Sequence, residues 1–324
     1  MASNNDLKGI AAGFAALYVL LAAGCGNPTT GEFRPHPFPV PDIPAMIGSE
    51  SEAVSYLAAH FWDDFTDTSE IFVCDSSIVN GVRKGEVEQA FANWTGYLHA
   101  VPLAEACGAV ERMFGRIVSF EERDTSANVF ETVASLAEKY LYDPNSPLRS
   151  EDLYLPFAGR MAECMLVSPG KRAAYEYDAG MCSLNRTGTP AADFAFCDRN
   201  GRRYTLYGLE SDYTLLFFSN PGCEACKYII DELKSDPELS SLIASGKVAV
   251  ANIYIDEDLE AWYGYQSIYP EEWYNGYDPN FIIRTDLLYN VRAIPSLYLL
   301  DRDKTVLLKD APEERIFAEL HKID

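Results

Sequence analysis

The stretch YTLLFFSNPGCEACK, residues 213–227, decides the fold of this 324-residue chain. Its first part, Tyr213–Phe218, is a continuous apolar run that suits a strand buried on both faces of a sheet. A tight turn follows, and apolar residues such as Ile229 recur beyond it at helical spacing. The pattern predicts a strand, a turn and a helix, with Cys223 where the helix begins and Cys226 one helical turn further on.

The position of Cys223 favours its thiolate form. The first backbone N–H groups of a helix are unpaired and the helix dipole is positive there, so a sulfur anion is stabilised. In thiol–disulfide exchange Cys223 would attack a substrate disulfide, and Cys226 would resolve the mixed disulfide. Glu224 opposes thiolate formation by its charge while Lys227 favours it, and the sequence leaves the sign of the net effect open.

A single C-x-x-C is a weak signal, because it also occurs as half of a zinc site or as a structural disulfide. A zinc site is disfavoured, since the sequence has no second C-x-x-C and its four histidines are scattered, at His36, His60, His99 and His321. The peptide Ile294-Pro295 stands directly before an apolar strand, Ser296–Leu300, and favours a redox-active pair over a structural bridge. We expect no metal and no cofactor other than the Cys223–Cys226 disulfide.

The other elements after residue 188 follow an order that predicts a fold class. Short strands are predicted at Phe194–Cys197, Tyr204–Leu206, Val248–Ile255, Ser296–Leu300 and Thr305–Leu308. A last helix begins near Pro312. Strand, helix, strand, hairpin and closing helix is the order of a thioredoxin-like α/β sandwich, which we assign to residues 188–324.

Two short sequences at the start of this region carry a resemblance to a known family. They are GTPAADF at residues 188–194 and DRNGR at residues 198–202. Together with the cysteine pair, they resemble the extracytoplasmic thioredoxin family that includes the cytochrome-c-maturation reductases. The resemblance implies exchange with extracytoplasmic protein thiols and disulfides, and an electron donor. It also makes Ile294-Pro295 similar to the cis-proline loop of thioredoxins, which lies against the cysteine pair and presents backbone to the substrate chain. Gly222 and this loop are the candidate substrate contacts.

Two departures from the family pattern bear on the chemistry. Gly222 stands where many thioredoxins carry Trp before the first cysteine. Many members also keep a buried acid on the preceding strand as proton acceptor for the second thiol. Leu215–Phe218 includes no acid, so the acceptor for Cys226 stays unassigned. A peroxiredoxin is disfavoured, because Leu216 and Asn220 occupy the upstream places where that family needs Pro and Thr or Ser.

Residues 49–186 show helical signals. Ser49-x-x-Glu52 has the form of a capping box. An apolar stripe runs along one predicted helix at spacings of four and three, formed by Leu103, Cys107, Val110, Phe114 and Ile117. We therefore predict a two-domain chain, with an α-helical domain of unknown function at residues 49–186 followed by the α/β sandwich. The arrangement resembles lipid-anchored bacterial proteins in which such a helical domain precedes a thioredoxin module.

The first residues form a targeting segment. Lys8 precedes an apolar run, Ile10–Ala23, that is short for a membrane span and ends in small residues before Cys25. This resembles the lipobox of bacterial lipoproteins, in which the cysteine carries the lipid and residues 1–24 are the signal peptide. A plain cleaved signal and a tail anchor are the alternatives. Residues 25–48 are rich in proline and are predicted as an extended spacer or as a segment packed along the domain surface.

Composition restricts the partners. The net charge is −23, with 49 acidic against 26 basic residues, so nucleic-acid binding is not expected. Five of the 8 cysteines remain, and we interpret them mainly as buried apolar residues: Cys74, Cys107, Cys164, Cys182 and Cys197. The sequence therefore predicts an extracytoplasmic thiol–disulfide oxidoreductase, lipid-anchored on the periplasmic side or the cell surface of a bacterial membrane. The alternative is a lipid-anchored binding or scaffold module without activity.

Overall fold

The structure is a computed structural model that describes residues 34–67, 69, 72 and 74–323. Residues from Pro35 onward form one compact unit. The predicted signal peptide and Cys25 lie outside the described residues. Among the helices of the described part, none combines the length and the apolar character that a membrane span requires.

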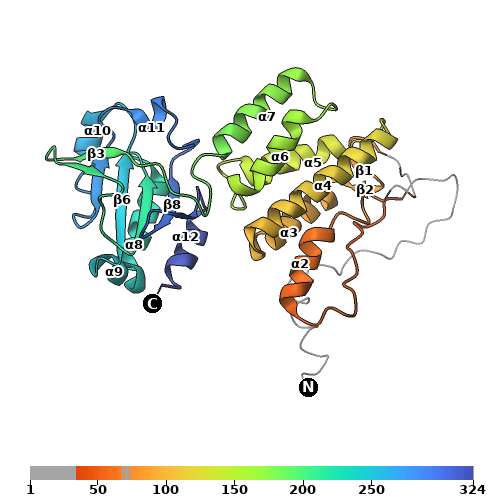
Figure 1. Cartoon of the computed structure of the whole chain (residues 1–324), viewed down its shortest axis with the longest axis horizontal. Helices are drawn as coiled ribbons and strands as arrows, with labels where there is room; N and C mark the ends of the chain where they lie inside the picture. The colour runs from red at the N-terminus through yellow and green to blue at the C-terminus, as the bar shows by residue number, and fades with distance from the viewer. Residues whose placement is uncertain (1–33, 68, 70–71, 73, 324) are drawn as a thin grey trace. The chain divides into compact units, whose positions relative to one another are not determined.

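The first half of the compact unit is built from helices, drawn in orange to light green in Figure 1. They are α2 (Glu50–His60), α3 (Lys84–Ala100), α4 (Leu103–Arg123), α5 (Val129–Ala137) with the π-helical turn η1 (Glu138–Tyr142), α6 (Glu151–Glu163) and α7 (Pro169–Cys182). Their apolar faces enclose one hydrophobic core. We call residues 35–182 the helical region.

Helix α4 shows how the sequence pattern produces this core. Its buried side chains follow helical spacing and are Ala106, Ala109, Val110, Met113, Phe114, Ile117 and Phe120. The stripe predicted from the sequence therefore faces the core, although Leu103 and Cys107 at its start are only partly buried. Each large apolar side chain that is fully buried in this way stabilises the fold by about 1.5–3 kcal/mol.

The helical region also contains a short hairpin and a leading segment without helix or strand. A hairpin of two very short strands, β1 (Ile78–Val79) and β2 (Val82–Arg83), precedes α3. The sequence pattern predicts only helices here, because strands of two residues show no periodicity. Residues 34–48 form neither helix nor strand. Phe38 packs on the helical core, with its ring centroid 5.4 Å from that of Phe61. Of the two interpretations of the proline-rich segment, its described part follows the one that packs along the surface.

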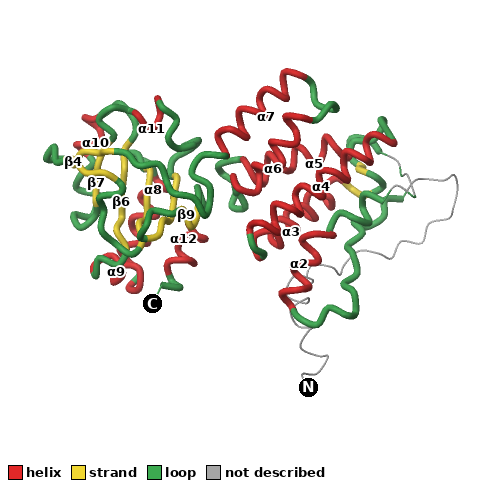
Figure 2. The backbone as a smooth tube through the Cα atoms, in the orientation of Figure 1, coloured by secondary structure: helices red, strands yellow, loops and turns green. Residues whose placement is uncertain are grey.

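The second half of the unit contains a seven-stranded sheet, drawn in yellow in Figure 2. Its strands lie in the order β4-β3-β7-β6-β5-β8-β9. They are β3 (Ala195–Asp198), β4 (Arg203–Thr205), β5 (Tyr213–Phe218), β6 (Val248–Tyr254), β7 (Tyr274–Tyr277), β8 (Ser296–Asp301) and β9 (Val306–Leu308). Strands β5, β6 and β7 are mutually parallel, and the other pairings are antiparallel. We call residues 188–323 the sandwich.

Both faces of the sheet are covered. One face packs on α8 (Glu224–Ser235), α9 (Pro237–Ala244), α10 (Leu259–Gly264) and α12 (Glu313–Leu320). The other face packs on α11 (Ile282–Thr285) and on loop residues such as Tyr289. Along β5, Leu215 and Phe217 point to the core beneath α8 and α12, while Leu216 and Phe218 point to the core beneath α11. This division explains the continuous apolar run from which the central strand was predicted.

Within the sandwich, strand β7 was not predicted from the sequence. Asn and Gly are depleted in strands, and they occupy two of its four positions, Asn275 and Gly276. A side chain at Gly276 would collide with the Phe196 ring on the neighbouring strand β3. The glycine is therefore explained by the close approach of two strands, which local propensity does not reveal.

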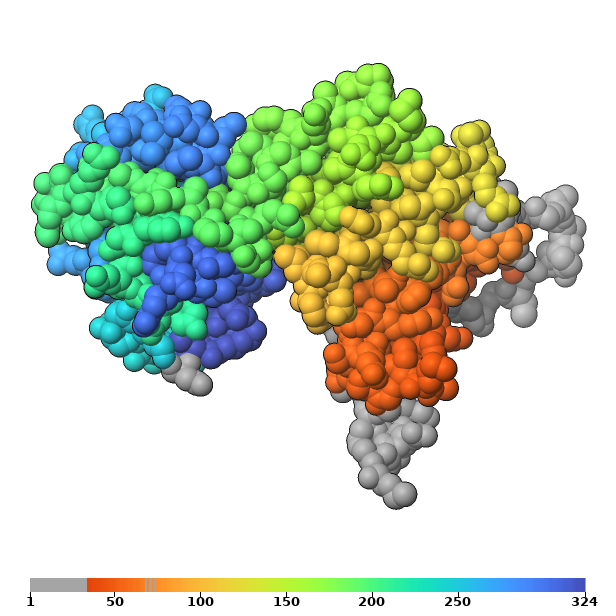
Figure 3. All heavy atoms as spheres, viewed as in Figure 1, coloured from red at the N-terminus to blue at the C-terminus, as the bar shows by residue number. Residues whose placement is uncertain are grey.

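The helical region and the sandwich are in direct contact, as the space-filling view shows (Figure 3). Side chains from one bind atoms of the other at several places, including Lys309 of the sandwich, whose Nζ donates to the carbonyl oxygen of Cys182 at 2.6 Å. That residues 49–186 and 188–324 are separate domains stays a prediction.

Candidate redox site

Cys223 is the N-cap residue of α8. Its Sγ atom accepts a hydrogen bond from the backbone N–H of Cys226 at 3.1 Å. Helix α8 runs for 12 residues. Its positive end and its unpaired N–H groups therefore stabilise negative charge on the Cys223 sulfur. The strand, turn and helix follow one another as the sequence pattern predicts, with β5 ending at Phe218 and α8 beginning at Glu224.

The two cysteines form a disulfide, with their Cα atoms 5.2 Å apart. They differ in accessibility. Cys226 is 2% exposed and lies in the core beside Ile229 and Ile230, whereas Cys223 is partly exposed. An incoming thiol or disulfide can therefore reach Cys223, while the sheet and α8 shield Cys226. Attack at the first sulfur and resolution by the second require this asymmetry.

Gly222 occupies the turn that brings Cys223 to the helix. Its φ angle is 73°, a left-handed conformation in which side chains are strained. No atom lies within 4 Å of the place that its Cβ would take. The backbone conformation, and not a lack of space, therefore accounts for glycine where many thioredoxins carry Trp.

Ile294 and Pro295 lie at the same edge of the sheet as the cysteine turn. Strands β5 and β8 are antiparallel, and Phe218 pairs with Ser296. The residues after Phe218 and those before Ser296 therefore leave the sheet side by side. The Ile294-Pro295 peptide bond is cis. Both residues are partly exposed.

A chain of uncharged polar groups lies under the site and was not predicted from the sequence. The Ser219 hydroxyl donates to Oδ1 of Asn252, and Asn252 donates to Oδ1 of Asn275 at 2.9 Å. Ser219 and Asn252 are each 1% exposed. By strand alternation they share the sheet face of Leu215 and Phe217, which pack with Cys226. The signal was a single polar residue inside the otherwise apolar strand β6.

Charged groups surround the turn without contacting the disulfide. Asn220 donates to the Asp256 carboxylate at 2.6 Å, and Arg284 pairs with the same carboxylate at 2.7 Å. Lys227 forms an ion pair with Asp231, one turn along α8, and this hydrogen bond raises the pKa of Lys227. The Lys227 ammonium is therefore directed to Asp231, and its tuning of Cys223 stays a prediction. Glu224, the other proposed tuning residue, is exposed in the first turn of α8.

The other described cysteines form no disulfide and are Cys74, Cys107, Cys164, Cys182 and Cys197. Cys182 is fully buried, and burial raises the pKa of its thiol. The remaining four are only partly buried, so the interpretation as buried apolar residues holds fully for Cys182 alone. Within the described part of the chain, no group of three or more His, Cys, Asp and Glu residues could hold a metal ion.

The sheet order, the position of the cysteine pair after β5 and the proline before β8 define a thioredoxin-like protein. The chain belongs to the family described as "Domain of unknown function (DUF5106)", whose model matches residues 22–185, a range that spans the helical region.

Solved structures are similar to this chain over different lengths. A thioredoxin-like protein from Bacteroides caccae is 36% identical, with 89% of this chain and 99% of that chain covered and a TM-score of 0.74. The C-terminal domain of an uncharacterized protein from Bacteroides fragilis is 44% identical, with 42% of this chain and 98% of that chain covered and a TM-score of 0.41. No curated protein matches the sequence.

Proposed function

We propose that this protein is a thiol–disulfide oxidoreductase that exchanges disulfides with proteins outside the cytoplasm. One observation carries the proposal. A partly exposed cysteine caps a 12-residue helix and is bonded to a buried cysteine one turn further on.

The reaction begins with the reduced pair. The Cys223 thiolate attacks one sulfur of a substrate disulfide, so that a mixed disulfide forms and the first substrate sulfur leaves as a thiolate that takes up a proton. The Cys226 thiol loses its proton and its sulfur then attacks Cys223, which releases the second substrate thiolate and closes the Cys223–Cys226 disulfide. Two electrons pass to the substrate, and a dithiol donor restores the reduced pair. The reverse sequence oxidises a substrate dithiol.

The substrate chain would bind along the partly exposed residues Ile294 and Pro295, with Gly222 on the other side of the disulfide. The register of β5 and β8 supports this arrangement, because it brings both segments to one edge of the sheet. Without a side chain, Gly222 leaves room for a polypeptide to approach Cys223.

Trapping the mixed disulfide tests the assignment of the two cysteines. With insulin and a dithiol donor, Cys223→Ser should lower the rate of disulfide reduction at least about 100-fold, since the attacking sulfur is gone. Cys226→Ser should lower turnover as well, but it should accumulate a covalent complex with the substrate that a reductant dissolves. Cys197→Ser is the matched control, because Cys197 is a partly buried free cysteine outside the site. A Cys223→Ser variant as active as the wild type would refute the proposal.

The anchoring part of the proposal rests on the sequence alone. The short apolar run and the small residues before Cys25 support lipid attachment, which would hold the folded unit at a membrane surface. The full-length protein expressed in a bacterium should incorporate a labelled fatty acid and fractionate with membranes, whereas Cys25→Ser should do neither. Equal labelling of both proteins would contradict a lipid on Cys25.

A second candidate is a lipid-anchored binding or scaffold module on the same fold. The observation in its favour is that β5, the strand before the cysteine turn, has no acid, where many active thioredoxins keep one. Titration of the disulfide against a dithiol separates the two candidates. An exchange enzyme cycles reversibly near the potential of its compartment, and a structural bridge resists reduction.

A further inference from the structure

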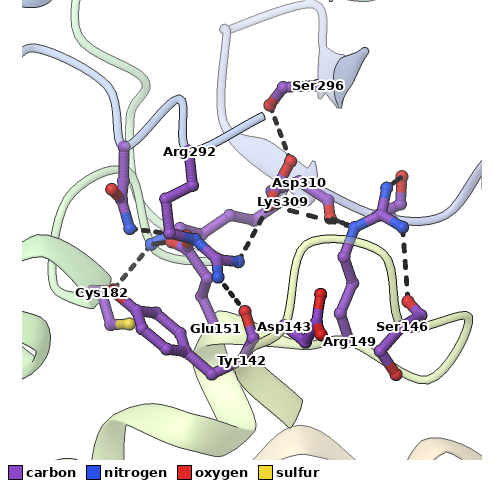
Figure 4. A network of polar contacts seen from close by, with 12 residues as sticks. Tyr142, Asp143, Ser146, Arg149, Glu151, Cys182, Arg292, Ser296, Lys309 and Asp310 are labelled. Carbon is purple, nitrogen blue, oxygen red and sulfur yellow. Dashed lines mark hydrogen bonds and ion pairs between the residues drawn. The ribbon is translucent and has the colours of Figure 1, made fainter. Parts of the chain in front are cut away.

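Five charged side chains lie together where the helical region meets the sandwich (Figure 4). They are Arg149, Glu151, Arg292, Lys309 and Asp310, and we call them the buried cluster. Four of them are buried, and the side chain of Arg292 is 13% exposed. The side chains of Glu151 and Lys309 are each only 1% exposed. Burying a charge costs several kcal/mol unless it is paired. Three cations share two carboxylates here. Each charge is therefore compensated only while its neighbours keep their positions.

Glu151 connects the helical region to the segment before Pro295. It is the first residue of α6, where the helix dipole favours a carboxylate. Its Oε1 accepts from Arg292 Nε at 3.0 Å and from Asn290 Nδ2 at 2.6 Å. Its Oε2 pairs with Lys309 Nζ at 2.9 Å. One carboxylate of the helical region thus binds two residues of the loop that leads to Pro295.

Asp310 binds the loop on the other side of Pro295. Its Oδ1 accepts from the Ser296 hydroxyl at 2.7 Å, and its Oδ2 lies 3.3 Å from Arg292 Nη2. Arg149 of the helical region binds the backbone of the same residue, because its Nε donates to the carbonyl oxygen of Asp310 at 3.0 Å. Ser296 is fully buried, so its hydroxyl has no access to bulk water as an alternative partner.

Arg292 has contacts on both sides of this interface. Its Nη1 donates to the carbonyl oxygen of Tyr142, and its guanidinium lies 4.1 Å from the centroid of the Tyr142 ring. With Glu151 and Asp310 as further partners, the planar group is bound in three directions. The several N–H groups of a guanidinium can bind all three partners together, whereas a lysine ammonium is a single point charge on a flexible stem.

We propose that the helical region positions the loop of residues 290–296, and with it Pro295, beside the Cys223–Cys226 disulfide through Arg292, Glu151 and Asp310. The inference rests on the proposed function, since that loop is the surface on which a substrate chain would lie. The three residues touch neither the disulfide nor the substrate, so they are positioning residues. Glu151 and Tyr142 lie within the residues that the family model matches, so the proposal gives that domain a role.

The charged character of the cluster supports positioning over simple stabilisation. Burial raises the pKa of Glu151 and of Asp310, and the neighbouring cations oppose that rise. Apolar residues of similar size often stabilise a fold as well as a buried ion pair does. What charged pairs add is directional contact, and here the contacts converge on both flanks of Pro295.

The experiment measures the loop and the reaction separately in the full-length protein. Arg292→Lys keeps the charge but cannot bind Glu151, Asp310 and Tyr142 together. Backbone amides of residues 290–297 should then exchange with deuterium about tenfold faster than in the wild type. With insulin as substrate, KM should rise about tenfold while kcat changes little, since the loop binds the chain and the sulfurs are unaltered. The rate with a small disulfide and the reduction potential should stay unchanged.

Matched variants make the result decisive. Arg199→Lys makes the same chemical change in a surface ion pair with Glu271 and should alter neither exchange nor KM. If Arg292→Lys does not fold, Ser296→Ala removes one hydrogen bond on the other flank of Pro295 and should shift the same measurements in the same direction.

The outcomes distinguish the inference from the proposed function. If deuterium exchange and KM in the folded variants match the wild type, the positioning role is wrong although the enzyme is active. If the wild type shows no disulfide exchange, the proposed function fails. The deuterium measurement then still decides whether the helical region holds the loop, because it needs no activity.

Discussion

At the scale of single residues, burial determines the charge of His99. This side chain of α3 lies between the Leu148 carbonyl, 3.1 Å from Nε2, and Arg315 of α12, whose Nη1 is 3.1 Å from Nδ1. A neutral ring satisfies both, donating at Nε2 and accepting at Nδ1. Burial and then the Arg315 charge lower the pKa of His99 from 6.5 to about 4. Protonation would place two cations in contact in a site with little water.

This lowered pKa predicts a pH-dependent stability. Because the unfolded state takes up a proton near pH 6.5 and the folded state only near pH 4, the stabilisation from neutral His99 is complete above pH 6.5 and is lost as the pH falls towards 4. The free energy of unfolding of the wild type, minus that of His99→Gln, should therefore fall by at most about 3 kcal/mol between pH 7 and pH 4. Urea titrations of both proteins measure it. A difference that is constant over this range would show that His99 is not held neutral.

At the scale of elements, the sequence predicts those that carry a strong local pattern. Strand β5 was predicted from its continuous apolar run, and α4 from its apolar stripe. Strand β7 was missed because its identity depends on pairing with distant residues, and the hairpin β1–β2 was missed because strands of two residues show no periodicity. Gly276 belongs to a strand only because Phe196 lies against it across the sheet. No pattern within four residues carries that information.

The same distinction applies to the redox site. Cys223, Cys226 and Pro295 could be placed from the sequence, because each adjoins an element with a clear pattern. The contact of Ser219 with Asn252 could not, since the two are 33 residues apart and meet only through the parallel pairing of β5 and β6. The buried cluster is still harder to predict from the sequence. Glu151 and Arg292 are 141 residues apart, and on a linear chain each looks like an ordinary surface charge.

At the scale of the whole molecule, the buried cluster couples the stability of the helical region to that of the sandwich. If the sandwich unfolded first, Glu151 and Arg149 would lose the ion pairs and hydrogen bonds that they form with its residues. Losing one partner of a buried pair costs about 3–5 kcal/mol. Most of the chain also matches the thioredoxin-like protein from Bacteroides caccae, with a TM-score of 0.74, so both regions occur together in that relative. Joint unfolding is the expected behaviour of such a unit.

Pulse labelling with deuterium in increasing urea tests this coupling. Peptides from α3–α6 and peptides from β5–β8 should become labelled at the same urea concentration in the wild type. In Arg149→Met the hydrogen bonds to the carbonyls of Asp310 and Ala311 are lost, and stability should fall by about 3 kcal/mol, with the two sets of peptides labelled at different concentrations. Arg302→Met removes an exposed ion pair with Asp212 and should leave both midpoints unchanged. Two separate midpoints in the wild type would mean that the regions are independent domains, and that the buried cluster does not join the two folds into one cooperative unit.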